Sequence, residues 1–586
     1  MMSKQVVHSS GVPSLSNGPG VLGFRLPWAF AILLLTTAVA YSPVLVFGYS
    51  PNGWDSRYHA IIARLFSDQL WSGDLYPRWL MGMNSGLGSP HFFFYQPLGF
   101  YIASLFSWIG GPTAVPQLGA AIVLLGFVSG VTCYLWLARM MPSTAAVVGA
   151  VFYLSAPVHL FTFLLMGGGY PTFVAMAFTP LCLLGVELFR ERKWYGLPII
   201  SLGFCAVTLS HIVVGLMFSG IPTVYFLARS GWRRGWLWGA VLVLVACGVG
   251  LGGSGFYLVP ALAYRPDAII PVWTLLPENF MFGFPSRPYL LLFYKVVFFC
   301  YGGFLIAATA WWRRSEARAS VDGNMVITCI FLGLATLSLM TIWTRPLWLM
   351  VPVAAAVQFT PRLLAIVDLC LAGLVGSFIA SLAAQPRLPR IVFAACLVFV
   401  GSALVGAAAA AYSGAFDYNA LLWQQRLHYT PDYRLFRPLT VHAALPADNL
   451  GLYYGPYSGP VVPLPPHVKI EKGDAQVRVL TWEPRRIILN VQAKSPGELI
   501  VGQLYFPGWQ AIDALSGNRL PIAPSSGQGL LTIRFPTGNM RLHISLAPRQ
   551  PEYEGVALSI FSFASLVLLA LASRRAMHRV SVPEHT

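Results

Sequence analysis

The chain has 586 residues, of which 56% are hydrophobic and only 10% are charged, and its mean hydropathy is +0.64. Soluble globular domains use roughly half apolar residues, so this composition excludes an ordinary soluble enzyme and indicates an integral membrane protein. The formal net charge of +17 raises the question of nucleic acid. Much of the Lys and Arg, however, stands in short clusters beside apolar runs, which positive-inside topology explains better, so we expect no nucleic-acid partner.

Apolar runs of about 18 to 27 residues recur along the chain, and each is long enough to cross a hydrocarbon layer of ~30 Å as a helix. The first run, residues 27–47, is too long for a signal-peptide core and has no small-residue cleavage site after it, so we expect a retained anchor after a cytoplasmic tail of residues 1–26. The sequence predicts about twelve or thirteen spans. They comprise a transmembrane domain of residues 27–411 and a final helix at 554–573, before a cytoplasmic tail of residues 574–586.

The basic clusters that include Arg190, Arg229 and Arg574 are expected to be cytoplasmic, which fixes the parity of the crossings. Under this assignment residues 91–108 lie at the outer interface, within a first outer loop of residues 48–112. The alternative is a conventional crossing by 91–108, which places Arg139 and the Arg190 cluster outside. The run 197–228 is expected to form two short helices broken at Ser210 and His211.

All eight cysteines fall in or beside apolar segments, so neither a disulfide framework nor a CxxC metal site is indicated. Between residues 412 and 553 the apolar runs vanish and polar, Pro and Gly residues take their place. The second half of this region alternates with period two between Gly, Pro and Asn turns, as in RRIILNVQA and LLTIRF. We expect an extracytoplasmic β-sandwich here, outside the membrane by the same parity.

The stretch WDSRYHAIIARLFSDQLW, residues 54–71, has apolar residues at the spacing of an amphipathic helix lying on the membrane surface. Asp55 and His59 are four residues apart, so they share a face if the helix begins by Asp55. An aspartate before an apolar-periodic run is also a standard N-cap. The two roles are not mutually exclusive, and the pattern alone leaves both open.

This loop resembles a known family. An aspartate just after the first span, then RYH, then SGDLYPRWLMGMNSGLGSPHFFFYQPLGFYIASL, is similar to the first outer loop of the GT-C superfamily of membrane glycosyltransferases. Within it the chain most resembles the bacterial membrane proteins related to 6-pyruvoyl-tetrahydropterin synthase. QLYFPGWQAI, residues 503–512, resembles a strand and turn in the outer domain of related multi-spanning proteins. The fold that the resemblance implies is a GT-C-like polytopic α-helical membrane protein with an extracytoplasmic C-terminal β-sandwich domain and a final transmembrane helix.

The resemblance implies a glycosyltransferase of a bacterial cytoplasmic membrane that moves a sugar from a polyprenyl-phosphate carrier to an extracytoplasmic glycan or lipid acceptor. Asp55 is the expected base or metal ligand by position, and His59 supports it. Many family members have a second acidic residue where this chain has Ser56, and the tip MGGGYPT, residues 166–172, has no carboxylate. Whether Mg²⁺ or Mn²⁺ takes part is therefore open, with Asp55 its ligand if it does. The expected substrate-binding residues are Arg57, Arg78, His91, Tyr95, His211, Arg265, Glu278 and Arg287.

Two other classes stay open. Asp368 lies within an apolar span, and intramembrane carboxylates mark ion or proton pathways, so a transporter or lipid-handling protein without catalysis is the rival. Asp368 is alternatively expected to pair with Arg362 or with a neighbouring helix. A membrane-tethered binding protein acting through the β-domain is the third class. In the transferase interpretation the β-domain orients a polymeric acceptor, and its Tyr505, Phe506 and Trp509 either stack on sugar or pack in the domain core. The GxGxxG match in CGVGLGGSG, residues 247–255, fits small-residue helix packing.

Overall fold

The computed structural model describes residues 26–49, 55–84, 86–109, 114–160, 169–193, 195–231, 235–268, 275–283, 288–314, 321–382, 438, 467–526 and 529–580. Its α-helices are α1 (Leu26–Ala40), α2 (Ser42–Phe47), α3 (Ser56–Trp71), α4 (His91–Phe94), α5 (Leu98–Ser104), α6 (Val115–Leu137), α7 (Ser143–Ser155), α8 (Tyr170–Arg190), α9 (Gly196–Ser210), α10 (Ile212–Phe218), α11 (Ile221–Ser230), α12 (Trp236–Gly253), α13 (Gly255–Ala263), α14 (Pro288–Arg314), α15 (Gly323–Leu339), α16 (Arg345–Leu349), α17 (Leu364–Ser381) and α20 (Gln550–Val580). Short 3-10 helices are η1 (Ser107–Ile109), η3 (Arg265–Asp267), η4 (Pro277–Asn279), η6 (Ile342–Thr344), η7 (Pro352–Val357) and η8 (Thr360–Leu363).

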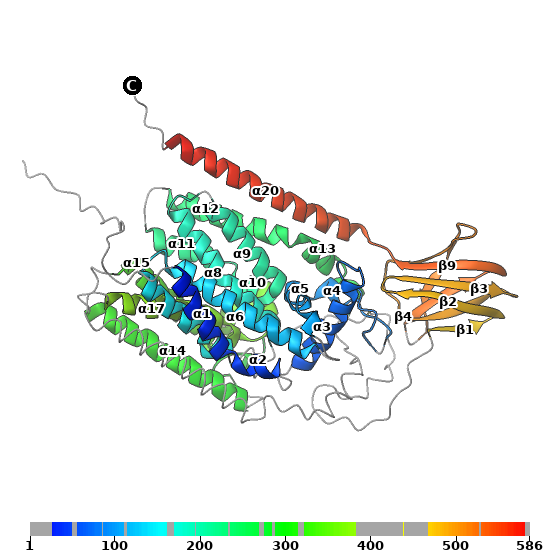
Figure 1. Ribbon diagram of the computed structural model, residues 1–586, viewed down its shortest axis with the longest axis horizontal. Coiled ribbons are helices and arrows are strands. Elements are labelled where there is room, and N and C mark those ends of the chain that lie inside the picture. The colour runs from blue at the N-terminus through cyan, green and yellow to red at the C-terminus, as the bar shows by residue number, and fades with distance from the viewer. Residues whose placement is uncertain are drawn as a thin grey trace, which may run out of the picture.

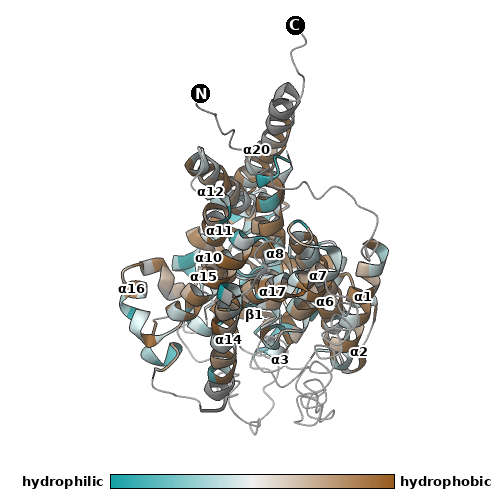
Figure 2. Ribbon diagram, turned by 90° about the vertical axis from the view of Figure 1, so that its left-hand side faces the viewer, coloured by the Kyte–Doolittle hydropathy of each residue, from teal (hydrophilic) through white to brown (hydrophobic). Residues whose placement is uncertain are grey.

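The helices form one bundle whose outer surface is apolar. Within the described residues, six helical segments are long and apolar enough to cross a membrane, and four shorter helices are also apolar. Large hydrophobic side chains such as Leu35, Phe299 and Phe561 are exposed on α1, α14 and α20, and hydrophobic residues dominate the bundle (Figure 2). A soluble protein does not present so much apolar surface to water, so these faces are suited to lipid. Part of the predicted transmembrane domain, residues 383–411, lies outside the described residues.

Two predicted irregularities of the bundle appear in the structure. The run 197–228 is broken at His211, whose backbone is extended (φ −158°, ψ 106°) between α9 and α10, as predicted. Residues 91–109 form only α4, α5 and η1, and the longest of them has seven residues, or ~10 Å. A helix of that length does not cross ~30 Å of hydrocarbon. The position of this segment at the outer interface stays a prediction.

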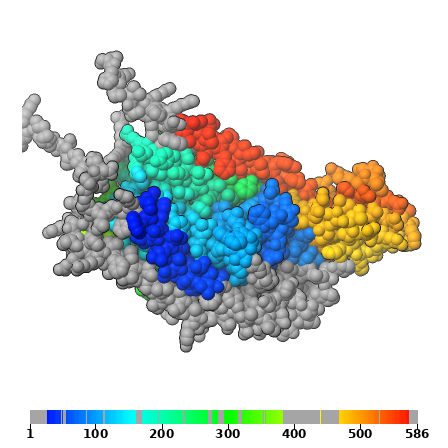
Figure 3. Space-filling view, viewed as in Figure 1, coloured from blue at the N-terminus to red at the C-terminus, as the bar shows by residue number. Residues whose placement is uncertain are grey.

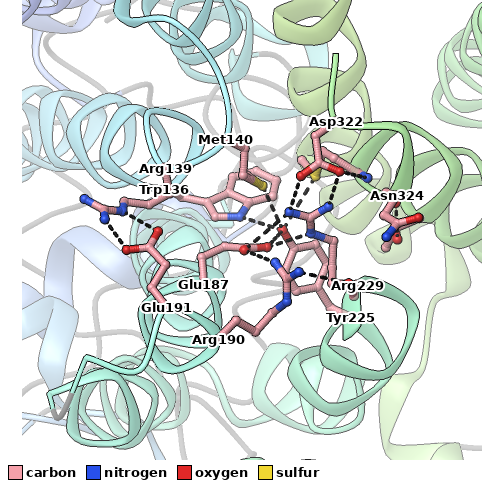
Figure 4. Close-up of polar contacts among 12 residues, drawn as sticks. Trp136, Arg139, Met140, Glu187, Arg190, Glu191, Tyr225, Arg229, Asp322 and Asn324 are labelled. Carbon is pink, nitrogen blue, oxygen red and sulfur yellow. Dashed lines mark hydrogen bonds and ion pairs between the residues drawn. The ribbon is translucent and has the colours of Figure 1, made fainter. Parts of the chain in front are cut away.

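One end of the bundle is held together by buried ion pairs (Figure 4). The Arg229 Nε atom of α11 donates to Glu187 of α8 at 2.7 Å, and its two terminal nitrogens donate to Asp322 at 2.8 Å. Arg190 also pairs with Glu187, and Arg139 pairs with Glu191. Clusters that the sequence predicts to be cytoplasmic therefore meet at one end of the bundle, where each buried charge has a partner.

The C-terminal region is the predicted β-sandwich, made of β1 (Val468–Lys472), β2 (Ala475–Glu483), β3 (Arg486–Ala493), β4 (Gly497–Leu504), β5 (Trp509–Asp513), β6 (Arg519–Leu520), β7 (Ile522–Pro524), β8 (Leu530–Phe535) and β9 (Gly538–Leu546). Two antiparallel sheets, β1-β4-β8-β7 and β2-β3-β9-β5-β6, face each other. Inward residues alternate with outward ones, as in β3, where Ile487, Leu489 and Val491 are buried. The sandwich extends from one end of the helical bundle (Figure 1).

The β-domain and the first outer loop share a hydrophobic core. Trp79 of the loop packs edge-on against Trp509 at 5.5 Å between ring centroids, and its indole N–H donates to the Gln503 side chain at 2.9 Å. The Leu504 backbone N–H donates to the Leu87 carbonyl at 2.6 Å. In the space-filling view the β-domain lies directly against the residues of this loop (Figure 3). The segment QLYFPGWQAI therefore joins the two parts of the chain.

The last helix, α20, begins earlier and ends later than the predicted span of residues 554–573. It follows β9 after a three-residue connection and packs along α13 and α12 (Figure 1). Glu552 in its first turn is buried and pairs with Arg78 of the first outer loop. The helix thus ties the β-domain, the outer loop and the bundle together at one point.

Candidate functional site

Helix α3 is the amphipathic helix that the sequence predicts. Its buried face carries Ile62 and Phe66, whereas Arg64 and Asp68 are exposed and form an i,i+4 ion pair at 2.7 Å. Asp55 occupies the N-cap position, but its side chain makes no capping hydrogen bond to the helix. The helix begins at Ser56, directly after Asp55, and the Asp55 carboxylate is not used as a capping group.

His59 lies one turn into α3 and is almost completely buried. Its Nδ1 atom lies 3.2 Å from the Tyr49 hydroxyl, and its Nε2 atom lies 2.9 Å from the Tyr95 hydroxyl. Both ring nitrogens of His59 are therefore engaged by phenols from two different segments. The phenols fix the orientation of the ring, and the backbone N–H of His59 donates to the Asp55 backbone carbonyl at 2.9 Å, the first hydrogen bond of the helix.

A second histidine, His91 of α4, extends this polar aromatic cluster. The Tyr58 hydroxyl lies 3.0 Å from its Nδ1 and 2.9 Å from its Nε2 atom. Burial, reinforced by the nearby His59, lowers the pKa of His91 to about 3. His91 is therefore neutral at physiological pH, so it serves as a hydrogen-bonding and packing group and not as a cation for a phosphate.

Arg362 supplies the positive charge of the site. It lies in η8 at the start of the span that contains α17, and one of its terminal nitrogens donates to the Val357 carbonyl at 3.0 Å. Burial raises the pKa of Asp55, and the charge of Arg362 acts in the opposite direction. In the described part of the chain no ion pair joins the two side chains within 4.0 Å. The carboxylate and the guanidinium act on each other through space without direct contact.

The break at His211 contributes to the same surroundings. The His211 Nδ1 atom accepts from the Val214 N–H at 3.3 Å, which makes the side chain the N-cap of α10. The charges of Arg362 and His59 both act on His211. The half-buried His211 imidazole is therefore close enough to Arg362 and His59 to feel their charges. Its side chain caps α10 because the break leaves the first N–H groups of that helix without helical partners.

Other predicted site residues lie in different settings. Arg78 is buried, pairs with Glu552, donates to the Phe256 carbonyl at 3.0 Å and stacks on Tyr76. Its charge is already matched by protein, so the structure gives it a role in joining the outer loop to α20. Arg265 is exposed on η3.

Glu278 is half-buried on η4. The Asn279 carbonyl of the same turn accepts from Thr360, two residues before Arg362, at 3.0 Å. The turn of Glu278 therefore lies close to the Arg362 side of the site. The Arg57 side chain and all of Arg287 lie outside the described residues.

Two aromatic residues of QLYFPGWQAI pack in the hydrophobic core. Phe506 and Trp509 are buried against Trp79, Phe93 and Tyr264. A buried ring has no face free for a sugar, so the alternative that Phe506 and Trp509 stack on a sugar is wrong. Tyr505 is half-buried.

Asp368 forms a separate, enclosed cluster. Its Oδ1 atom accepts from the Tyr301 hydroxyl at 2.5 Å, and its Oδ2 atom lies 3.6 Å from His159 Nδ1. His159 Nε2 in turn lies 3.1 Å from the Ser129 hydroxyl. The expectation that Asp368 pairs with Arg362 is therefore wrong, and the alternative, pairing with neighbouring helices, is confirmed.

A divalent metal on Asp55 fits the surrounding donor set poorly. Mg²⁺ and Mn²⁺ prefer several oxygen ligands, and His59 already has both nitrogens engaged. No group of three His, Cys, Asp or Glu side chains with the spacing of a metal site occurs among the described residues. Among the described side chains, the cation that acts on Asp55 is the Arg362 guanidinium.

The sequence did not single out Arg362, Tyr49 or Tyr58 for this site. Arg362 stands at the start of an apolar run, where a basic residue usually reads as a membrane-end anchor. Tyr49 lies at the start of the predicted first outer loop, residues 48–112, and was not among the predicted site residues. The signal that could have found Arg362 is its position in a polar turn, QFTPR, between two apolar segments that are expected to meet the outer face.

Comparisons with known proteins give a family and partial structural likenesses. A part of the mycobacterial arabinofuranosyltransferase AftD aligns with TM-score 0.41 and 16% identity, over 67% of this chain and 27% of that one. The Archaeoglobus fulgidus oligosaccharyltransferase aligns with TM-score 0.40 and 13% identity, over 75% and 62% of the two chains. ArnT from Cupriavidus metallidurans, bound to undecaprenyl phosphate, aligns with TM-score 0.42 and 15% identity, over 73% and 85%. This chain thus spans about a quarter of AftD and less than two thirds of the oligosaccharyltransferase.

No curated protein sequence matches the chain. The sequence model of the 6-pyruvoyl-tetrahydropterin synthase related domain, described as a membrane protein, matches residues 92–413. This match covers more than half of the 586 residues and includes Tyr95, the His211 break and Arg362. The chain belongs to the 6-pyruvoyl-tetrahydropterin synthase related family of membrane proteins.

Proposed function

We propose that this protein is a membrane glycosyltransferase that moves a sugar from a polyprenyl-phosphate carrier to an acceptor hydroxyl outside the cytoplasm. The observation that carries the proposal is that the Asp55 carboxylate caps no helix and feels the charge of Arg362. The Asp55 carboxylate is half-buried and does not cap the helix. The charge of the Arg362 guanidinium acts on this carboxylate without direct contact. Together they can take a proton and stabilise a phosphate, which are the two needs of this transfer.

The position of the site along the bundle supports the outer face. Helix α8 begins at Tyr170, whose ring lies 6.3 Å from that of His59, and ends at Arg190 in the ion-pair network. Its 21 residues separate the two ends by ~30 Å, the thickness of the hydrocarbon core. If the basic network faces the cytoplasm, the Asp55 cluster faces outward.

The chemistry requires a base because a sugar hydroxyl has a pKa far above 7. Asp55 takes the acceptor proton as the acceptor oxygen forms its bond to the anomeric carbon. The bond from that carbon to the phosphate oxygen breaks, and its electron pair leaves with the polyprenyl phosphate. Attack opposite the leaving group inverts the anomeric centre, through an oxocarbenium-like state as in glycoside hydrolysis.

Arg362 is the proposed partner of the leaving phosphate, since a guanidinium offers parallel donors to phosphate oxygens. His59 holds the first turn of α3 through its two phenol contacts and thereby positions Asp55. Burial raises the pKa of Asp55, which makes the ionised carboxylate a stronger base than that of an aspartate in water. The proposal routes no step through a metal.

The direct test is the release of polyprenyl phosphate from a panel of polyprenyl-phosphate sugars by the purified full-length protein. Asp55→Asn keeps the shape but cannot accept the proton, so we expect release to fall by at least ~100-fold. Asp68→Asn is the matched control on the same helix, because Asp68 is exposed and forms an ion pair with Arg64. Equal activity of the two variants would contradict the assignment of Asp55 as base.

A further inference from the structure

The five-stranded sheet of the β-domain has an outward face whose polar residues align across strands. Because facing residues in antiparallel strands share one side of a sheet, each register gives a row across β2, β3 and β9. Arg478, Asn490 and Arg541 form one such row, and the next row consists of Gln476, Gln492 and Asn539. All of these side chains are exposed or half-buried, while the alternate positions form the domain core.

A third row continues the face toward the far edge of the sheet. Ile488 faces His543, His543 faces Ile512 of β5, and Ile512 faces Arg519 of β6. Arg478 and Arg541 are separated by two strand spacings, or ~10 Å, and Arg541 and His543 by two residues, or ~7 Å. Three arginines and a histidine thus share one flat face with four side-chain amides.

The acidic residues of the domain do not neutralise this face. Between residues 467 and 546 there are nine Lys and Arg and five Asp and Glu. The carboxylates have partners elsewhere. Glu471 pairs with Lys469, Asp474 with Lys494, Glu483 with Arg486, and Glu498 with Lys472 and Arg534, while Asp513 binds backbone N–H groups of its own turn and of Arg541.

The three arginines of the face therefore remain unmatched within the described residues: no carboxylate there forms an ion pair with Arg478, Arg519 or Arg541. Arg534 provides a contrast, since it has the same chemistry on the opposite sheet and is paired with Glu498 at 3.0 Å. The surplus positive charge of the domain is concentrated on one side.

We infer that this face binds an acidic glycan, one that carries carboxylate or phosphate groups along its length. Guanidinium groups bind such anions through parallel hydrogen bonds, and the interspersed Asn and Gln side chains can both donate to and accept from sugar hydroxyls. A flat, amide-rich sheet with spaced arginines matches a repeating anionic polymer better than a single small anion. This binding does not depend on sugar transfer by the Asp55 site.

A membrane surface is the competing occupant, and the structure disfavours it. Faces that dock on lipid combine basic residues with large exposed apolar side chains. The apolar members of these rows, Ile488 and Ile512, are only half-exposed. The sandwich also extends outward from the end of the helical bundle (Figure 1), which holds it away from the hydrocarbon.

The experiment measures binding of an oligogalacturonate, as a polyuronate probe, to the full-length protein in phosphatidylcholine nanodiscs, with a neutral maltooligosaccharide of equal length as reference. The variants are Arg478→Gln/Arg541→Gln and, as matched control on the other sheet, Arg534→Gln. Thermal melting checks that each variant is folded. No sugar donor is present, so the result is independent of the proposed transferase activity.

We expect the polyuronate to bind, the neutral oligosaccharide not to bind, and binding to weaken with rising salt. Loss of two charged hydrogen-bond donors should weaken binding at least ~10-fold in the double variant and leave R534Q unchanged. Equal binding by the double variant and R534Q, or equal binding of the neutral sugar, would overturn the inference. If the polyuronate binds in phosphatidylcholine nanodiscs but not in phosphatidylglycerol nanodiscs, lipid headgroups are the occupant of this face. That result would also overturn the inference.

Discussion

Asp55 and Asp368 are both carboxylates in a largely apolar protein, but their surroundings differ. Asp368 is fully buried, and the Tyr301 hydroxyl and the His159 ring face its two oxygens. Asp55 is half-buried at a helix start, makes no cap hydrogen bond, and senses Arg362 without touching it. A carboxylate enclosed by protein partners stabilises packing, whereas one with an uncommitted side chain beside a cation is suited to act on a ligand.

The same contrast applies to arginines. Arg78 is matched by Glu552, and Arg229 is matched by Glu187 and Asp322. Arg362 donates only to a backbone carbonyl and to the Gln358 side chain in the described structure. The predictions below test whether this difference between matched and unmatched charges separates structural groups from functional ones.

After Asp55→Asn, the largest effect on release is expected for Arg362→Gln. If Arg362 stabilises the leaving phosphate, removing its charge should lower the rate of polyprenyl-phosphate release by about 10- to 100-fold, the value of a charged hydrogen bond. Arg345→Gln is the control, because Arg345 donates to the Leu275 carbonyl and its charge is not among those that act on Asp55. If release falls as much in R345Q as in R362Q, the proposed role of Arg362 as the ligand of the leaving phosphate is contradicted.

The pH dependence of transfer sharpens the assignment of the base. Asp55 must be ionised to accept a proton, and burial raises its pKa. Release should therefore fall as pH falls through that raised pKa, at a higher pH than for an aspartate of ordinary pKa near 3.9. Arg362 holds the pKa of Asp55 down, so the acid limb of R362Q should move to still higher pH. An acid limb that does not shift in R362Q would break the proposed coupling.

A smaller effect on transfer, but a clear one on stability, is expected for Glu552→Gln. Glu552 joins Arg78 of the outer loop to Tyr264 and to the Arg549 N–H of the β-domain junction. Removing one member of a buried ion pair costs about 3 to 5 kcal/mol, so the melting temperature should drop. Glu554→Gln is the exposed control two residues on, and it should melt as the unaltered protein does. A normal melting temperature for E552Q would show that Arg78 is not held in this way.

Local patterns predicted the elements correctly where the cause is local. Period two gave the β-sandwich, the apolar spacing of residues 54–71 gave α3, and the interruption at Ser210 and His211 gave the break between α9 and α10. These signals arise from neighbours within a few residues, which is the range that periodicity reports.

The partners of charged residues were not predictable in the same way. Arg78 pairs with a carboxylate 474 residues further along the chain, and Arg362 acts on an aspartate near the first span. Nothing in the local pattern of either arginine distinguishes a phosphate ligand from a structural ion pair. The role of each arginine depends on its tertiary neighbours: Glu552 for Arg78, and Asp55 for Arg362.

The measurement that tests the account most directly compares Asp55→Asn and Asp368→Asn in one assay of polyprenyl-phosphate release, with the amount of folded protein determined for each. We predict that D55N loses at least ~100-fold in release while D368N, per folded molecule, stays within ~3-fold of the unaltered protein. The reverse result, with D368N inactive and D55N nearly normal, would contradict a transferase centred on Asp55 and favour a carrier that uses the buried Asp368 cluster.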